Sequence, residues 1–261
     1  DIQLDSRYAE GRRERLPEIA AELVEEKVDV IITANEPALR AAKQATTTIP
    51  IVVLAMDYDP LASRLIDSLS RPGGNVTGVS LLQTQLLGKR LEILKEALPR
   101  TRRVIVFWDS FSRKQLKDLE PAARTLNVQL SPVEVPSNAD FTALFRRAKE
   151  KADAGMFLFS PAFFLPRAKI AVEARRAGLP TMFQEPWYTA AGGLLSYGPD
   201  ITEALRRVAY FVDRLLKGAK PSDLPVEQIT KFHLAVNLKT AKALGVRIPE
   251  SVLMRADEVI R

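Results

Sequence analysis

The chain has 261 residues, and its 38 basic and 32 acidic side chains give a formal charge of +6 at pH 7. It has no cysteine and a single histidine, His233. This composition excludes disulfides, thiolate metal sites and iron–sulfur clusters, and it leaves any Ser-His-Asp mechanism dependent on one residue. No run approaches the roughly 18 to 20 apolar residues that span a membrane. Arginine pairs are spread along the chain rather than gathered in one stripe, so we expect no nucleic-acid partner.

Apolar periodicity predicts alternating strands and helices in the first third of the chain. Strands are expected over residues 2–8, 28–33, 49–55 and 76–79. Helices are expected over 16–26, 37–43 and 60–69. The glycine-rich run 72–75 precedes a strand, which favours a turn over a phosphate-binding loop.

The same alternation restarts after an amphipathic helix expected over 84–98. Strands are expected over 103–108, 128–133, 155–159, 180–183, 193–197 and 230–237. Helices are expected over 112–126, 140–151, 163–177, 186–191 and 201–217. Strands separated by crossover helices indicate an α/β protein with parallel sheets and right-handed connections. No flexible linker divides the chain, so any crossing between two domains must run on structured segments.

The motifs of common enzyme classes are absent. There is no Gly-x-Gly-x-x-Gly after a strand, no Walker loop and no Gly-x-Ser-x-Gly elbow. Asp57 and Asp59 flank Tyr58, but Asp59 precedes a proline, which favours helix capping over paired-carboxylate catalysis. His233 lies in an alternating strand pattern, which favours a structural or surface role. We therefore expect no catalytic residue, no metal and no cofactor.

Polar and aromatic residues follow six of the expected strands, each time before a helix. These segments are 33–37, 56–60, 108–111, 160–163, 184–188 and 196–199. In open parallel sheets ligands bind beyond the carboxyl ends of the strands, where helix N-termini offer free N–H groups to anions. The alternative is that they are ordinary strand-to-helix loops.

Several motifs, taken together, resemble the ABC-transporter substrate-binding family that includes tryptophan- and tyrosine-type binding proteins. They lie at 41–45, 48–52, 71–78, 88–92, 192–199, 224–228, 237–245 and 255–260. The resemblance covers the whole chain and implies the periplasmic-binding-protein type I fold, with two Rossmann-like lobes, a hinge of several crossings and a ligand cleft between the lobes. It also implies delivery of the ligand to a membrane permease. The implied location is periplasmic or extracytoplasmic, after removal of a signal peptide that this chain does not show.

The resemblance also implies how the lobes divide the chain. The first lobe is expected to hold residues 1–79 plus 199–222, and the second 80–196 plus 226–261. Family members have a further strand and helix before the segment equivalent to residues 2–11. Without that strand the first sheet is expected to leave an unpaired edge at 2–8 or 28–33, and such an edge favours self-association.

Mapped by motif, the expected ligand-binding residues come from both lobes. They are Asn35, Glu36, Asp57, Tyr58, Asp59, Asp109, Ser110, Ser160, Phe163, Gln184, Glu185, Tyr188 and Tyr197. This set combines acids, hydroxyls and rings, so it suits an amino acid with an aromatic or apolar side chain. Two alternatives remain: a small-molecule enzyme that uses the carboxylates, and the effector domain of a regulator. The lack of a helix-turn-helix segment counts against an intact regulator.

Overall fold

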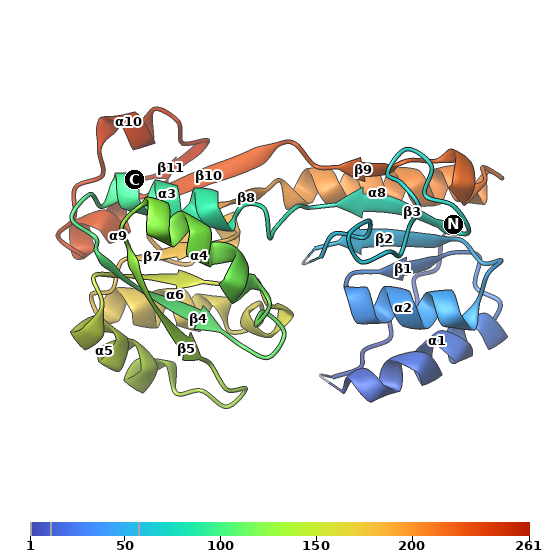
Figure 1. The fold of residues 1–261 in the computed structure, drawn as a ribbon, viewed down its shortest axis with the longest axis horizontal. Coiled ribbons are helices and arrows are strands. Elements are labelled where there is room, and N and C mark those ends of the chain that lie inside the picture. Colours follow the sequence, from blue (N-terminus) through green and yellow to red (C-terminus); the bar gives the residue numbers. More distant parts are fainter. Residues whose placement is uncertain (1, 11, 57) are drawn as a thin grey trace. The chain divides into compact units, whose positions relative to one another are not determined.

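The computed structural model describes residues 2–10, 12–56 and 58–261, which form two compact units (Figure 1). Unit 1 comprises Asp1–Leu82 and Asp200–Thr230, and unit 2 comprises Gln83–Pro199 and Lys231–Arg261. The chain therefore passes between the units three times. No helix of the described residues is both long and apolar enough to cross a membrane.

Unit 1 is built on a four-stranded parallel sheet. Its strands, in spatial order, are β1 (Ile31–Thr33), β2 (Ile51–Ala55), β3 (Val76–Ser80) and β9 (Val226–Gln228). Its helices are η1 (Arg13–Arg15), α1 (Leu16–Glu25), α2 (Glu36–Ala45), α8 (Ile201–Leu216) and η3 (Pro221–Asp223). Successive side chains of a strand point to opposite faces. Val53 of β2 therefore packs with Leu39 of α2, whereas Val52 packs with Phe211 of α8, which covers the other face (Figure 1).

Gly78 lets β2 and β3 pair closely. Its φ is +134°, and a Cβ at this position would lie 2.2 Å from the carbonyl oxygen of Val53 and 2.5 Å from its nitrogen. Val53 is also its register partner in the parallel ladder. Only glycine combines this backbone conformation with this approach of main chain to main chain.

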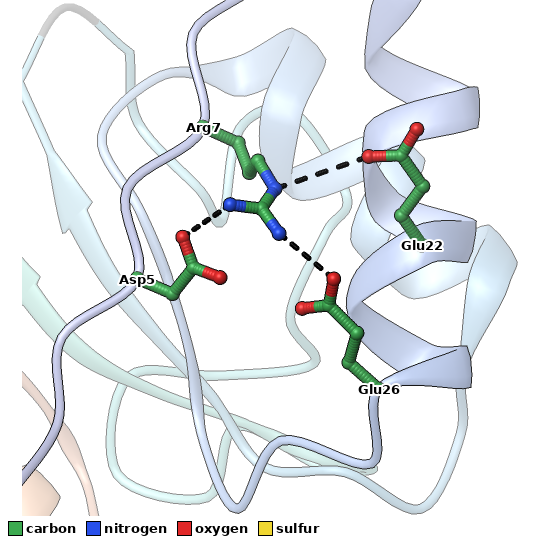
Figure 2. A network of polar contacts seen from close by, with 4 residues as sticks. All are labelled: Asp5, Arg7, Glu22 and Glu26. Carbon is green, nitrogen blue, oxygen red and sulfur yellow. Dashed lines mark hydrogen bonds and ion pairs between the residues drawn. The ribbon is translucent and has the colours of Figure 1, made fainter.

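The prediction of a strand over residues 2–8 is wrong. Residues 2–9 have no regular structure, and Ile2, Leu4 and Tyr8 are exposed. The segment is instead held to α1 through Arg7, whose guanidinium pairs with Asp5, Glu22 and Glu26 (Figure 2). A strand needs a neighbouring ladder for its N–H and C=O groups, and no described strand pairs with this segment.

The helix expected over 60–69 is also absent, and turns take its place. The carboxylate of Asp59 does accept hydrogen bonds from the amides of Leu61 and Ala62, as a helix cap would. The backbone then turns left-handed at Arg64, with φ +55°, which ends the first turn.

Unit 2 holds a seven-stranded sheet. Its spatial order is β11 (Glu258–Ile260), β10 (Phe232–Asn237), β8 (Leu195–Pro199), β7 (Thr181–Phe183), β6 (Ala154–Phe157), β4 (Arg103–Trp108) and β5 (Gln129–Glu134). All neighbours are parallel except β10 and β8, which run antiparallel. The helices are α3 (Leu87–Ala97), α4 (Gln115–Thr125), α5 (Phe141–Lys151), η2 (Pro161–Phe163), α6 (Arg167–Arg176), α7 (Pro186–Ala190), α9 (Leu238–Ala243) and α10 (Glu250–Leu253).

Aromatic rings fill one face of this sheet. Phe107 of β4 stacks on Phe157 of β6 at 4.5 Å between ring centroids, and Phe157 stacks on Phe183 of β7 at 5.6 Å. Phe145 of α5 meets Phe107 edge to face at 5.2 Å. Aliphatic residues of α3 and α4 cover the opposite face (Figure 1). The carboxyl ends of β4, β6 and β7 therefore rest on a tightly packed base.

Replacing Gly78 with alanine is expected to lower the free energy of unfolding by about 2–4 kcal/mol, because the new methyl group meets the main chain of Val53 at a strained φ. Urea unfolding measures the loss. Gly74→Ala is the matched control: its φ is +58°, and nothing lies within 4 Å of the added methyl. That control should cost only about 1–2 kcal/mol of backbone strain. Equal losses in the two variants would contradict the close-approach argument.

Candidate ligand site

The loops after β4, β6 and β7 meet at one edge of unit 2, because these strands are parallel neighbours. The loop after β4 carries Asp109 and Ser110, and the loop after β6 carries Ser160. The loop after β7 carries Gln184 and Glu185. The structure thus brings together the residues predicted from three separate motifs.

Asp109 joins two of these loops. One carboxylate oxygen accepts hydrogen bonds from the amides of Phe111 and Ser112, at 3.1 and 2.9 Å, and from the Ser112 hydroxyl at 2.8 Å. The other accepts from the Ser160 hydroxyl at 2.5 Å. Ser160 in turn caps η2 by accepting from the amide of Ala162. Asp109 and Ser160 therefore position the loops, while Ser110 remains exposed.

Two buried glutamines hold the loop after β6 in place. Gln115 donates to the carbonyl oxygen of Phe159 at 2.9 Å and accepts from the Phe159 amide at 3.1 Å. Gln184 donates to the carbonyl oxygen of Phe157 at 2.5 Å. The loops at this edge are thus tied by side chains to main-chain groups, which leaves little freedom for rearrangement.

Phe163 and Tyr188, both expected at the ligand, lie in the core. Phe163 meets Phe157 edge to face at 5.2 Å, and the Tyr188 ring stacks on Phe183 at 4.6 Å. The Tyr188 hydroxyl donates to the carbonyl oxygen of Phe163 at 2.9 Å. These residues support the surface above them.

Exposed aromatic and cationic groups lie above this core. Phe164 and Trp187 are 41% and 40% exposed and meet edge to face at 5.3 Å. The guanidinium of Arg167 lies 4.3 Å from the centre of the Phe164 ring, and that of Arg113 lies 5.5 Å from the Trp108 ring. We call Phe164, Trp187 and Arg167 the aromatic edge. An aromatic compound with an anionic group matches its chemistry.

Glu185 is only 5% exposed, beneath this surface, and burial raises its pKa to about 7. The cation that interacts with Glu185 is Arg90, which is fully buried and whose own pKa is lowered to about 10 by desolvation. Gln83 lies between them. Its side-chain nitrogen is 3.5 Å from a Glu185 oxygen, and its side-chain oxygen accepts from Arg90. Tyr197, expected at the crossing, contributes its carbonyl oxygen to Arg90, while its ring packs on Phe232.

In unit 1 the predicted residues mostly have local partners. Asn35 caps α2 by accepting from the amide of Ala38 at 2.9 Å. Glu36 pairs with Arg40 one turn further along, and Tyr58 is buried in the core. Asp57 lies outside the described residues. His233, on β10, is half-buried in unit 2.

The sequence interpretation missed the cations of this edge. Arg113 and Arg167 stand just beyond the strand-end motifs, two residues after Phe111 and four after Phe163. Extending each motif into the first turn of the following helix would have found both. Gln83 and Arg90 gave no such signal, because a buried arginine in a helix has the same local pattern as an exposed one. No cluster of His, Cys, Asp or Glu able to hold a metal ion occurs among the described residues.

The chain forms two α/β units with largely parallel sheets, and polar and aromatic residues follow the carboxyl ends of the strands. This arrangement is typical of the periplasmic-binding-protein type I fold, a class that captures small ligands. The family profile described as "ABC transporter substrate binding protein" matches residues 1–260. The chain therefore belongs to the ABC transporter substrate-binding protein family, and the predicted resemblance is confirmed.

Named and solved relatives agree with this assignment. A Clostridioides difficile protein named tyrosine-binding protein is 25% identical over 253 residues, which cover 95% of this chain and 72% of that protein. A conserved domain protein from Vibrio cholerae superposes with a TM-score of 0.86 at 28% identity, over 98% of this chain and 87% of that one. An ABC domain from Streptococcus pneumoniae, solved in complex with L-Trp, gives a TM-score of 0.82 at 26% identity, over 99% and 90%.

Ser160→Ala is expected to lower the free energy of unfolding by about 1.5–3 kcal/mol, the scale of a hydrogen bond to a charged group. It removes the 2.5 Å bond to Asp109 from a buried site. Ser110→Ala is the control, because Ser110 is exposed on the same edge, and it should change stability by less than about 0.5 kcal/mol. Chemical denaturation of both variants decides, and an unaffected Ser160→Ala would contradict the linking role of Asp109.

Glu185 is expected to make stability depend on pH. Between the ordinary value of 4.5 and about 7 the folded state holds the proton more tightly than the unfolded state. The free energy of unfolding therefore falls as pH rises through this window, by about 3 kcal/mol, and then levels off. Glu185→Gln cannot titrate and should lack this fall. Urea unfolding of both proteins from pH 4.5 to 8 measures the difference, and parallel curves would show that Glu185 titrates normally.

Proposed function

We propose that this solute-binding protein captures an aromatic amino acid for an ABC importer. The observation that carries the proposal is the aromatic edge, where two half-exposed rings and a guanidinium lie together on the carboxyl end of the unit 2 sheet. The names of the relatives support the same class, since one is a tyrosine-binding protein and another was solved with L-Trp.

The rings provide the apolar part of recognition. Phe164 and Trp187 come from the loop after β6 and from α7, so a ligand ring placed against them contacts two elements at once. Aromatic pairs contribute about 0.5–1.5 kcal/mol beyond the area they bury. Their core partners Phe163 and Tyr188 hold the underlying backbone in place.

Arg167, within the aromatic edge, is a cation that can bind the ligand carboxylate. The Arg167 guanidinium is stacked on Phe164, and one of its N–H groups donates to the Phe164 carbonyl oxygen at 2.8 Å, which leaves further donors. Arg113, over Trp108, is exposed on the neighbouring loop. In this proposal the two arginines bind the ligand carboxylate, for which the sequence indicated the free N–H groups of helix N-termini.

Calorimetric titration tests the ligand class. L-Tryptophan, L-tyrosine and L-phenylalanine are expected to bind, while tryptamine, which lacks the carboxylate, should bind at least about tenfold more weakly, since it loses the charge-assisted contact to arginine. With L-phenylalanine as the titrant, Trp108 and Trp187 supply the fluorescence signal for a parallel titration, because phenylalanine does not absorb where tryptophan is excited. Binding of aromatic acids but none of the amino acids would refute the proposal.

Substitutions locate the ligand. Arg167→Met and Trp187→Ala should each weaken L-tryptophan binding by about tenfold or more, because each removes one side of the aromatic edge. Arg124→Met is the control: Arg124 is an exposed arginine near the end of α4. Unchanged affinity in both edge variants would place the ligand elsewhere.

We further propose that the protein lies outside the cytoplasm and delivers its ligand to a membrane permease, as the family implies.

The alternative of an enzyme on this architecture predicts turnover of the bound amino acid. Mass spectrometry of the ligand after prolonged incubation separates the two functions, because a binding protein returns the amino acid intact.

We also propose that unit 1 self-associates through the edge of β1. No described strand pairs with the outer side of β1, and Ile32 on this edge is 47% exposed. Open strand edges recruit other chains, and a charge on the edge blocks this. Ile32→Lys should therefore abolish concentration-dependent association in sedimentation velocity, whereas association that persists would rule out this edge.

A further inference from the structure

Arg90 lies at the centre of a polar cluster that the proposed ligand contacts do not use. The cluster consists of Gln83, Arg90, Glu185 and the carbonyl oxygen of Tyr197, and all four belong to unit 2. Arg90 on α3 is 0% exposed, and Glu185, at the N-cap of α7, is 5% exposed. A fully buried guanidinium needs partners for its donors, so its contacts fix whatever carries those partners.

Two of these partners lie on the segments that link the units. Gln83 is the first residue of unit 2, and its carbonyl oxygen accepts from Arg90 at 3.3 Å, while its side-chain oxygen accepts from the other terminal nitrogen. The carbonyl oxygen of Tyr197, two residues before the end of that stretch of unit 2, accepts from the Arg90 Nε at 2.7 Å. One side chain thereby holds two of the three connecting segments.

The third partner is the ligand loop after β7. The side-chain nitrogen of Gln83 reaches Glu185 at 3.5 Å, so Gln83 bridges the cation and the carboxylate. The backbone is equally close here. A Cβ on Gly198 would lie 2.0 Å from the carbonyl oxygen of Gln184 and 3.6 Å from Arg90. The loop that carries Glu185 and Trp187 thus rests directly on the segment that leaves unit 2.

We propose that Arg90 is a positioning residue for ligand capture: through Gln83, Glu185 and the Tyr197 carbonyl it locks the β7–α7 loop to the segments that connect unit 2 with unit 1. A ligand that changes the position of this loop then also shifts the connecting segments, because the buried side chains of Arg90 and Gln83 join the two. The inference rests on the proposed function where its readout is ligand affinity.

The pKa of Glu185 reports on the contact between Arg90 and this loop, because it depends on the charges around the carboxyl group. Arg90 of α3 is the cation that opposes its raised pKa. The hydroxyl of Tyr188 on α7 interacts with Glu185 and with Arg167, while that of Tyr197 on β8 interacts with Arg90. Removing the cation while the carboxyl stays buried must raise the pKa of Glu185 further.

Three variants separate charge from geometry, and two further variants serve as controls. Arg90→Met removes both, Arg90→Lys keeps the charge but not the planar fork, and Gln83→Leu removes the bridge while Arg90 keeps its two main-chain partners. Lys89→Met, next to Arg90 but paired with Glu92 at the surface, is the matched charge control. Leu119→Ala, in the aliphatic core of unit 2, is the control for general destabilisation.

Three measurements are made on the full chain: L-tryptophan affinity, amide exchange of residues 83–87 and 184–188, and the Glu185 pKa from its carboxyl ¹³C shift. We expect Arg90→Met and Gln83→Leu to weaken L-tryptophan by about tenfold, one lost charge-assisted contact, and to speed exchange in both segments. Arg90→Met should also raise the Glu185 pKa, and Arg90→Lys should leave it near the wild-type value. Lys89→Met should change none of the three, and Leu119→Ala should leave the Glu185 pKa unchanged.

The outcomes distinguish this inference from the proposed function. If wild-type protein binds L-tryptophan but Arg90→Met and Gln83→Leu bind it equally well, Arg90 does not position the loop. If the exchange of 83–87 and 184–188 rises no more than in Leu119→Ala, the effect is only loss of stability and the inference fails. If wild-type protein binds no aromatic amino acid, the proposed ligand is wrong, and exchange together with the Glu185 pKa still decides the role of Arg90.

Discussion

The buried guanidinium of Arg90 is the constraint on which the arrangement of the unit 2 edge depends. A cation removed from water is tolerated only when fixed dipoles or an opposite charge replace the lost hydration. Here the replacements are two main-chain carbonyl groups and one amide side chain, with a carboxylate beyond. A carbonyl group moves only with its backbone. The hydrogen bonds to Arg90 therefore restrict the backbone positions of residues 83 and 197. A neutral side chain at this position would remove both ties, so residue 83 would lose this anchor and residue 197 would be held by the β8–β10 ladder alone.

Polar side chains elsewhere at this edge follow the same logic. Asp109, Ser160, Gln115 and Gln184 each bind main-chain amides, carbonyl groups or one another across neighbouring loops. Residues that resemble a ligand-binding set in the sequence thus act as the internal support of the loops. Because these residues are engaged with one another and with the main chain, the proposed function assigns ligand recognition to groups that remain half-exposed. This division explains why the aromatic edge consists of Phe164, Trp187 and Arg167.

The sequence predicts the architecture well because both sheets are covered on two faces and their strands read as short apolar runs. It fails where tertiary context decides. The alternating pattern of residues 2–8 suits a strand, but no described strand pairs with it, and Arg7 ties the segment to α1 instead. The helix expected over 60–69 has a good cap at Asp59, yet the left-handed turn at Arg64 ends it. The strands β4, β7 and β10 end at the expected residues, while β6 ends two residues earlier and β8 two residues later than expected. The direction of each side chain depends on packing that periodicity does not encode.

Glu185 shows why the direction of a side chain, and not only its place at a strand end, matters for function. From the sequence alone, Glu185 is a carboxylate just after a strand, in the motif 184–188, and it suits a ligand ammonium. In the fold it is buried, its pKa is raised to about 7, and its contacts lead inward to Gln83 and toward Arg90. Glu185 and Trp187 lie two residues apart on the same short loop. Under the proposed function, a ligand bound against the Trp187 ring is therefore coupled through this loop to the buried carboxylate, although the carboxylate itself does not touch the ligand.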